Sequence, residues 1–165
     1  MLAALGAGFL RPAPGTWGSL VAVIAAFPLH QIGGPYALGA AALLFYFAGV
    51  EAVKAETAGA EDHDPSWIVI DEVVGQWIAL VPVSAGAVVA GVPLLALWPG
   101  LVAAFVFFRL FDIWKPWLVG RADRRNDATG VMLDDVWAGV FAGVAVLALA
   151  ALAHAGFVAS VPDQL

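Results

Sequence analysis

The sequence contains no cysteine, and charged residues make up only 12% of its 165 positions. The first absence excludes disulfides, thiolate nucleophiles and cysteine-based metal sites. The scarcity of charge accompanies a hydrophobic fraction of 62%, which is well above the roughly 45–50% apolar content of soluble domains. The mean hydropathy is accordingly high, at +0.92. A net charge of −6 argues against nucleic acid as a partner, because phosphate backbones require a basic surface. The composition therefore predicts a membrane protein.

Three long stretches lack Asp, Glu, Lys and Arg altogether: residues 12–50, 73–108 and 136–162. One helical crossing of a bilayer takes roughly 20 residues, so the first two stretches each accommodate two crossings and the third accommodates one. Turn signals occur where hairpins are required, at Gly33-Gly34-Pro35 and at either Gly91-Val92-Pro93 or Trp98-Pro99-Gly100. We therefore expect a polytopic all-α helix bundle with about five transmembrane helices in a single domain covering 1–165. The expected helices are 16–31, 36–56, 67–86, 93–115 and 133–156.

This topology places Arg11 and both charged clusters, 51–72 and 109–135, on one side of the membrane. All seven Lys and Arg residues lie on that side, which the positive-inside rule assigns to the cytoplasm. The alternative is a soluble all-α bundle with buried apolar helices, which the composition disfavours.

The first group of reactive residues is Asp71-Glu72, at the end of an apolar run, with the segment 62–66 (DHDPS) shortly before it. Adjacent carboxylates in an apolar run are costly in a membrane and usually mark an ion or proton site. The structural alternative is that the pair ends a helix in the headgroup region. His63 is a single histidine within this group and is equally compatible with either role.

The second group is Arg109, Asp112 and Lys115, spaced so that they form one stripe near a helix end. Two cations flanking a carboxylate can hold an oxyanion and a metal together. Intrahelical ion pairs, with Lys115 extending to the headgroups, are the structural alternative.

The third group is Asp134-Asp135 at the predicted start of the last helix. An Asp at a helix N-cap accepts backbone N–H bonds and needs no further role, but this explains one aspartate more easily than two. A carboxylate pair facing other acidic groups suits a hard divalent cation with oxygen ligands.

Weaker signals lie elsewhere. Residues 11–20 (RPAPGTWGSL) contain a glycine-rich turn whose hydroxyl residues, Thr16 and Ser19, open a helix that can present N–H groups to phosphate. Thr16 is equally suited to an N-cap. His30 and His154 are expected to be packing or interfacial residues. A basic set is expected to contact lipid headgroups: Arg121, Arg124 and Arg125.

Four blocks resemble the phosphatidylglycerophosphatase A family, in the order found in that family. They are residues 14–20 (PGTWGSL), 64–75 (DPSWIVIDEVVG), 108–116 (FRLFDIWKP) and 130–139 (GVMLDDVWAG). Residues 121–129 depart from the family pattern in being more basic and in lacking a glycine-rich approach. The resemblance implies a Mg²⁺-dependent hydrolase that converts phosphatidylglycerophosphate to phosphatidylglycerol at the cytoplasmic face of the bacterial inner membrane.

This resemblance leads to an assignment of roles. The expected Mg²⁺ ligands are Glu72, Asp112, Asp134 and Asp135; the expected catalytic residues are Asp71, Glu72, Asp112 and Asp135; the expected substrate-binding residues are Arg109, Lys115, Thr16 and Ser19. Other phosphatase chemistries are excluded, because the sequence lacks a Cys-Arg loop, an Arg-His-Gly run and an Asp-x-Asp nucleophile pattern followed by Thr or Val.

Some alternatives stay open from the sequence. Attack on phosphorus by water or by a carboxylate cannot be separated, and a homo-oligomer is compatible with the chain. A divalent-cation transporter using the same carboxylates is the competing function. It is disfavoured because transport requires acidic residues accessible from both sides. A non-catalytic assembly protein would leave the stripe of Arg109, Asp112 and Lys115 unexplained.

Overall fold

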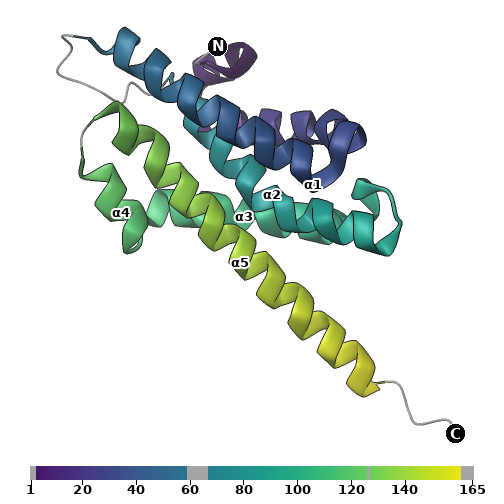
Figure 1. Cartoon of the computed structure of the whole chain (residues 1–165). Helices are drawn as coiled ribbons and strands as arrows, with labels where there is room; N and C mark the ends of the chain where they lie inside the picture. Colours follow the sequence, from purple (N-terminus) through teal and green to yellow (C-terminus); the bar gives the residue numbers. More distant parts are fainter. Residues whose placement is uncertain (1–2, 59–66, 126, 161–165) are drawn as a thin grey trace, which may run out of the picture.

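The computed structural model describes residues 3–58, 67–125 and 127–160. Over these residues the chain is helical and contains no strand, which confirms the predicted all-α class (Figure 1). The elements in chain order are η1 (Ala4–Phe9), α1 (Pro14–Glu56), α2 (Ile70–Ala90), η2 (Leu94–Leu97), α3 (Trp98–Trp114), α4 (Leu118–Asp123) and α5 (Ala128–Ser160).

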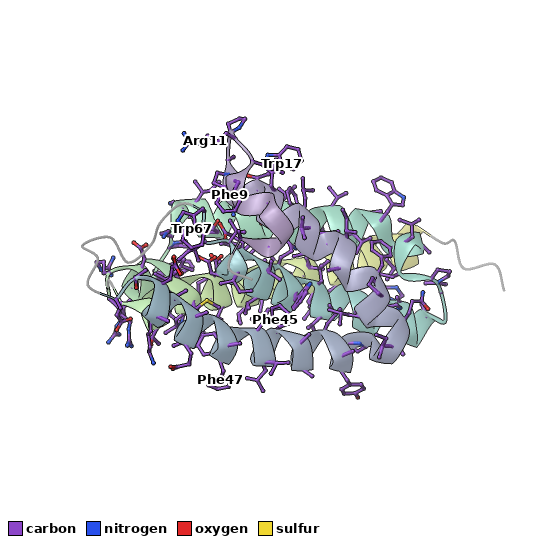
Figure 2. All side chains as sticks on the ribbon, turned by 90° about the horizontal axis from the view of Figure 1, so that it is seen from above. Phe9, Arg11, Trp17, Phe45, Phe47 and Trp67 are labelled. Carbon is purple, nitrogen blue, oxygen red and sulfur yellow. The ribbon has the colours of Figure 1, made fainter. Side chains whose placement is uncertain are left out.

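Helix α1 is a helical hairpin. Its 43 residues are interrupted at Gly33 and Gly34, where the backbone leaves the helical region. Gly34 has φ 58° and ψ −140°, a combination that is open essentially to glycine alone, and Pro35 then starts the second arm with its fixed φ. Figure 2 shows the two arms running back along each other. The predicted first hairpin is therefore confirmed.

The second hairpin joins α2 to α3. Gly91 ends α2 in the left-handed conformation with φ 65°, and Val92 N–H donates to the Ala87 carbonyl at 3.0 Å, as in a Schellman-type helix end. Of the two turns expected from the sequence, Gly91-Val92-Pro93 is thus the correct one. Trp98 and Pro99 begin α3 instead, since proline is well suited to the first helical turn.

The last helix starts earlier than the sequence suggested. Helix α5 begins at Ala128, not at 133, because Asp127 accepts the Gly130 N–H at 2.6 Å and caps it. Asp134 and Asp135 consequently lie in the second turn, and the N-cap interpretation of Asp134 is wrong. The short helix α4 was not predicted.

Within the described residues, four helices are long and apolar enough to span a membrane: α1, α2, the η2–α3 unit and α5. Because α1 doubles back, they provide five segments, in agreement with the predicted number. The chain is accordingly a membrane protein. The loop residues 62–66, including His63, lie outside the described residues.

Helix α2 lies at the centre and packs against α1, α3 and α5. Its Trp77 indole N–H donates to the Ala22 carbonyl in the first arm of α1 at 2.9 Å. The Trp77 ring also meets the Phe45 ring of the second arm edge-on, with 5.0 Å between centroids. One side chain therefore ties both arms of the hairpin to α2.

Helices α2 and α5 cross where Gly75 of α2 faces Gly139 of α5. A Cβ atom on Gly139 would collide with the Gly75 carbonyl, and one on Gly75 would lie 2.6 Å from the Asp135 carbonyl oxygen. Small residues allow helix backbones to approach closely in membranes. This contact lies one turn from Asp71 and Glu72 and brings Asp135 beside them.

We expect Gly139→Ala to destabilise the protein by about 1–3 kcal/mol, the usual cost of overpacking. A lower thermal midpoint in detergent would show this. Gly39→Ala is the matched control, because a Cβ at Gly39 meets nothing within 4 Å and alanine favours the helix. Equal midpoints for the two variants would contradict the role of the crossing.

Candidate active site

A cavity of about 220 Å³ opens where the N-terminal ends of α1 and α2 meet the C-terminal end of α3 and the second turn of α5. Its lining is unusually polar for a membrane protein, with seven charged side chains. It is lined by Ala13, Pro14, Gly15, Ile68, Asp71, Glu72, Arg109, Asp112, Lys115, Asp134 and Asp135.

Three carboxylates in this cavity form a compact group, which we call the acidic trio: Asp71, Glu72 and Asp135. One oxygen from each lies within 4.8 Å of the others. Asp71 and Glu72 occupy the first turn of α2, where the helix dipole favours negative charge, and α5 contributes Asp135. Asp135 is 2% exposed and Asp71 8% exposed. Such buried like charges are costly unless a cation compensates them.

The donor set of the trio fits a hard divalent cation. It offers only carboxylate oxygens, as Mg²⁺ and Ca²⁺ prefer. In addition, Glu72 Oε2 is buried and has no hydrogen-bond donor among the residues that the structure describes. A buried polar atom without a partner calls for an explanation such as an ion. The trio could therefore hold a metal ion.

Arg109 reaches the same cavity from α3. Its Nη1 lies 2.6 Å from Asp112 Oδ2 and 3.9 Å from Glu72 Oε1. The pair with Asp112 lacks hydrogen-bond alignment, so the buried Nε and Nη1 have no hydrogen-bond acceptor within the described part of the chain. A guanidinium with unused N–H groups beside a cation-binding group is suited to an oxyanion.

Lys115 also lines the cavity. It ends α3 in the left-handed conformation, with φ 50°, and its Nζ donates to Asp134 Oδ2 at 2.9 Å and to Asp123 of α4. Burial alone would lower the pKa of Lys115, but the hydrogen bonds to Asp123 and Asp134 outweigh it and raise that pKa above its ordinary value. Lys115 is therefore a permanent cation that links α3, α4 and α5.

The predicted metal ligands are thus divided in the structure. Glu72 and Asp135 lie together, and Asp71, predicted as catalytic only, joins them. Asp112 and Asp134 line the cavity but are engaged elsewhere: Asp112 pairs with Arg109, while Asp134 binds Lys115 and accepts the Asp135 N–H at 3.0 Å.

The predicted hydroxyl residues do not line the cavity. The buried Ser19 hydroxyl donates to the Gly15 carbonyl at 2.9 Å, and Thr16 follows the helix start without capping it, since Ala13 is the N-cap residue. The backbone of Pro14 and Gly15 borders the cavity instead. The backbone of the glycine-rich turn therefore borders the site, whereas the Ser19 hydroxyl is engaged within α1.

Sequence reasoning missed two residues. A Cβ on Gly15 would collide with Glu72 Oε1 and lie 3.0 Å from Arg109 Nη1, so glycine lets α1 approach both side chains. Gln76 lies one helical turn after Glu72, is fully buried, and has no hydrogen-bond partner for either amide atom among the described residues. The only sequence signal for Gln76 was a polar residue in an apolar run.

The two histidines of the apolar segments lie away from this cavity. His30 Nδ1 forms a 2.7 Å hydrogen bond with the Ser84 hydroxyl, between α1 and α2. His154 lies on α5 beside an apolar cavity of about 520 Å³ near the other end of the bundle.

Comparison with known proteins identifies the family. Residues 1–150 match Phosphatidylglycerophosphatase A. The chain belongs to the phosphatidylglycerophosphatase A family. The resemblance drawn from the four sequence blocks is therefore confirmed, and the protein is an enzyme, a phosphatase that acts on a phosphate monoester.

The alignments with three curated relatives cover most of this chain and most of each relative. The chain is 36% identical to phosphatidylglycerophosphatase A of Haemophilus influenzae over 145 residues, or 87% of this chain and 83% of the relative. It is 33% identical to phosphatidylglycerophosphatase A of Escherichia coli over 140 residues, covering 82% and 73%. A Bacteroides thetaiotaomicron protein, named provisionally as a phosphatidylinositol-3-phosphatase, is 40% identical over 147 residues, covering 86% of each chain. No solved structure matches the chain.

Proposed function

We propose that this protein hydrolyses the terminal phosphomonoester of phosphatidylglycerophosphate in glycerophospholipid biosynthesis, in a Mg²⁺-dependent reaction at the cytoplasmic face of the bacterial inner membrane. The products are phosphatidylglycerol and inorganic phosphate. The observation that carries the proposal is one cavity in which the acidic trio faces an arginine with unused N–H donors. Family membership supports the lipid substrate.

In this proposal the acidic residues of the cavity bind the cation and the basic residues bind the phosphate. Asp71, Glu72 and Asp135 would hold the cation, which when bound would neutralise phosphate charge and orient the attacking water. The Arg109 guanidinium binds nonbridging phosphate oxygens through its free N–H groups, while Asp112 fixes its orientation at 2.6 Å. Lys115 holds Asp134 in place and adds positive charge to the wall. The water oxygen forms a new bond to phosphorus, the bond between phosphorus and the ester oxygen breaks, and a proton from the water is transferred to the ester oxygen as the lipid alcohol leaves.

Exposed aromatic residues support a position for the site at the headgroup level. Trp17, Trp114 and Trp117 are exposed at the end of the bundle that holds the cavity, and Tyr36 and Trp98 at the other end. Trp and Tyr concentrate at both membrane interfaces. Along α3, Trp98 and Trp114 are separated by roughly 24 Å at 1.5 Å per residue, close to the thickness of a hydrocarbon core. A phosphate headgroup would reach the cavity without leaving the interface.

The same arrangement disfavours cation transport. The acidic side chains of the cavity gather at one end of the bundle, whereas the large cavity near the other end is lined by apolar residues and His154, with no acidic residue. The described Lys and Arg residues also lie toward the acidic end, which supports a cytoplasmic orientation.

Phosphate release from purified protein in mixed micelles tests the proposal. We expect turnover of phosphatidylglycerophosphate with Mg²⁺ present, and weaker turnover of phosphatidylinositol 3-phosphate. The second lipid is the relevant comparison because the Bacteroides relative carries that name. No release from phosphatidylglycerophosphate would overturn the proposed substrate.

Arg109→Lys should reduce kcat/KM about 10-fold or more although it keeps the charge, because an ammonium cannot replace two parallel N–H bonds to phosphate. Steady-state phosphate release measures this. Arg121→Lys, at an exposed position on α4, is the matched control and should match wild type. Wild-type kinetics for Arg109→Lys would leave Arg109 as an ion-pair partner of Asp112 only.

A further inference from the structure

An apolar surface begins at the mouth of the cavity and runs down the outside of the bundle. We call it the apolar track; it comprises Phe9, Leu10, Trp17, Leu20 and Ile24. All five side chains are exposed, from 37% for Leu20 to 70% for Phe9 and Ile24. Pro14 lines the cavity, and Trp17 and Ile24 follow it at i+3 and i+10, on the same side of the helix. The track therefore connects the cavity with the lipid-facing surface.

The first residue of the track, Phe9, packs against Trp67, which lies next to the cavity. The Phe9 ring stacks on Trp67 with 6.2 Å between centroids and 15° between planes. Gly8 is so close to the backbone of Trp67 that a Cβ there would collide with the Trp67 carbonyl. Trp67 precedes Ile68, which lines the cavity. Figure 2 shows Phe9, Arg11, Trp17 and Trp67 close together on one side of the molecule, opposite to Phe47.

An exposed cation, Arg11, accompanies the track. Arg11 is exposed and stands two residues before Ala13, which lines the cavity. It forms no ion pair with any acidic residue that the structure describes, whereas Arg109 and Lys115 are both paired within the cavity. An exposed arginine next to an aromatic, apolar surface at the interface is suited to an anionic phospholipid.

We infer that the apolar track and Arg11 bind the diacylglycerol part and the phosphodiester of the lipid substrate while its terminal phosphate occupies the cavity. The inference rests on the proposed function and goes beyond it by assigning the surface that recognises the lipid. Phosphatidylglycerophosphate carries two phosphates, one on each side of its terminal glycerol: a phosphodiester toward the diacylglycerol and a terminal phosphomonoester. The monoester meets Arg109, and the diester meets Arg11 a short distance outside. The acyl chains then lie along Trp17, Leu20 and Ile24 within the leaflet.

Other exposed apolar residues provide a control. Leu43 and Phe47, on the second arm of α1, are 60% and 61% exposed. They line a separate apolar cavity that shares no residue with the active-site cavity. A general effect of removing lipid-facing side chains would therefore appear equally at Leu43 and Phe47.

The experiment compares two substrates in mixed micelles: dioleoyl phosphatidylglycerophosphate and its deacylated, water-soluble counterpart, which retains both phosphates. The variants are Trp17→Ala/Ile24→Ala, Arg11→Gln, Arg11→Lys and the control Leu43→Ala/Phe47→Ala. We expect the track variant, Trp17→Ala/Ile24→Ala, to raise KM for the diacyl lipid about five-fold or more. A change of this size corresponds to losing part of the binding free energy that two apolar side chains contribute. Its kinetics on the deacylated substrate should equal wild type.

Arg11→Gln should raise KM for both substrates, and Arg11→Lys should restore part of the loss. Equal KM values for the track variant and the control on the diacyl lipid, or equal losses on both substrates, would overturn the inference while leaving the proposed function intact. If wild type released no phosphate from the diacyl lipid, the proposed function itself would fail.

A second measurement does not depend on turnover or on variants. The diacyl lipid with a diazirine in one acyl chain, photolysed with wild-type protein, should label residues 9–24 in preference to 98–106. Excess unlabelled substrate should remove that labelling. A diazirine-bearing phosphatidylcholine should label lipid-facing segments without such competition, and the same pattern from both lipids would contradict the assignment.

Discussion

Treatment with EDTA should reduce phosphate release by at least about 100-fold, the scale of losing a main electrostatic element of catalysis. The reason is that Asp71, Glu72 and Asp135 place three carboxylate oxygens within 4.8 Å of one another, and without a cation this negative charge would repel the phosphate. Adding Mg²⁺ should restore the rate, and steady-state phosphate release measures both steps.

The thermal midpoint supplies an independent readout. A cation that binds only the folded state stabilises it by about 2.7 kcal/mol at 100 times its dissociation constant, so saturating Mg²⁺ should raise the midpoint of wild type in detergent. The double variant Glu72→Gln/Asp135→Asn is the control and should show no such rise. Full activity in excess EDTA would exclude the metal mechanism.

Glu72→Gln and Asp135→Asn should each lower kcat by at least about 100-fold while the protein accumulates in membranes at normal levels. Each change removes a ligand from the acidic trio but keeps the size of the side chain. Without metal, each also relieves repulsion between neighbouring carboxylates, so the fold should not suffer. Quantified membrane fractions and phosphate release test both statements.

The remaining acidic residues make this test specific. Asp71→Asn should resemble Glu72→Gln, because Asp71 belongs to the same trio. Asp134→Asn should be milder, since Asp134 binds Lys115 and the Asp135 N–H. The control is Glu51→Gln on an exposed turn of α1, where Glu51 pairs with Lys54 at 2.7 Å. Loss of activity in Glu51→Gln with a fully active Glu72→Gln would place the site elsewhere.

The number and arrangement of apolar helices could be predicted because they follow from simple physical constraints. Uncharged stretches of the right length must be helical in a bilayer, and Gly33-Gly34-Pro35 is a turn signal with a conformational cause. The start of α5 could not be read in the same way. Several polar residues precede it, and only the structure shows that Asp127 is the cap.

The charged residues that line the cavity could be named from the sequence, but their grouping could not. Asp112 and Asp134 resemble metal ligands in the sequence as much as Asp135 does. Their engagement with Arg109 and Lys115 depends on how α3, α4 and α5 meet. The requirement for glycine at Gly15 likewise depends on the approach of Glu72 and Arg109, which no local pattern encodes.

The two hairpins also bear on how the chain enters the bilayer. Neither the Gly33–Gly34 turn nor the Gly91–Pro93 turn has a charged residue nearby in the sequence. Carrying an Asp, Lys or Arg into the middle of a membrane costs about 2.5–3.5 kcal/mol by insertion scales. With the charged end in the cytoplasm, as proposed, each hairpin would insert as a unit during biogenesis without carrying an ionised side chain across the membrane. In that orientation, the charged residues that line the cavity would stay in the compartment in which they are synthesised.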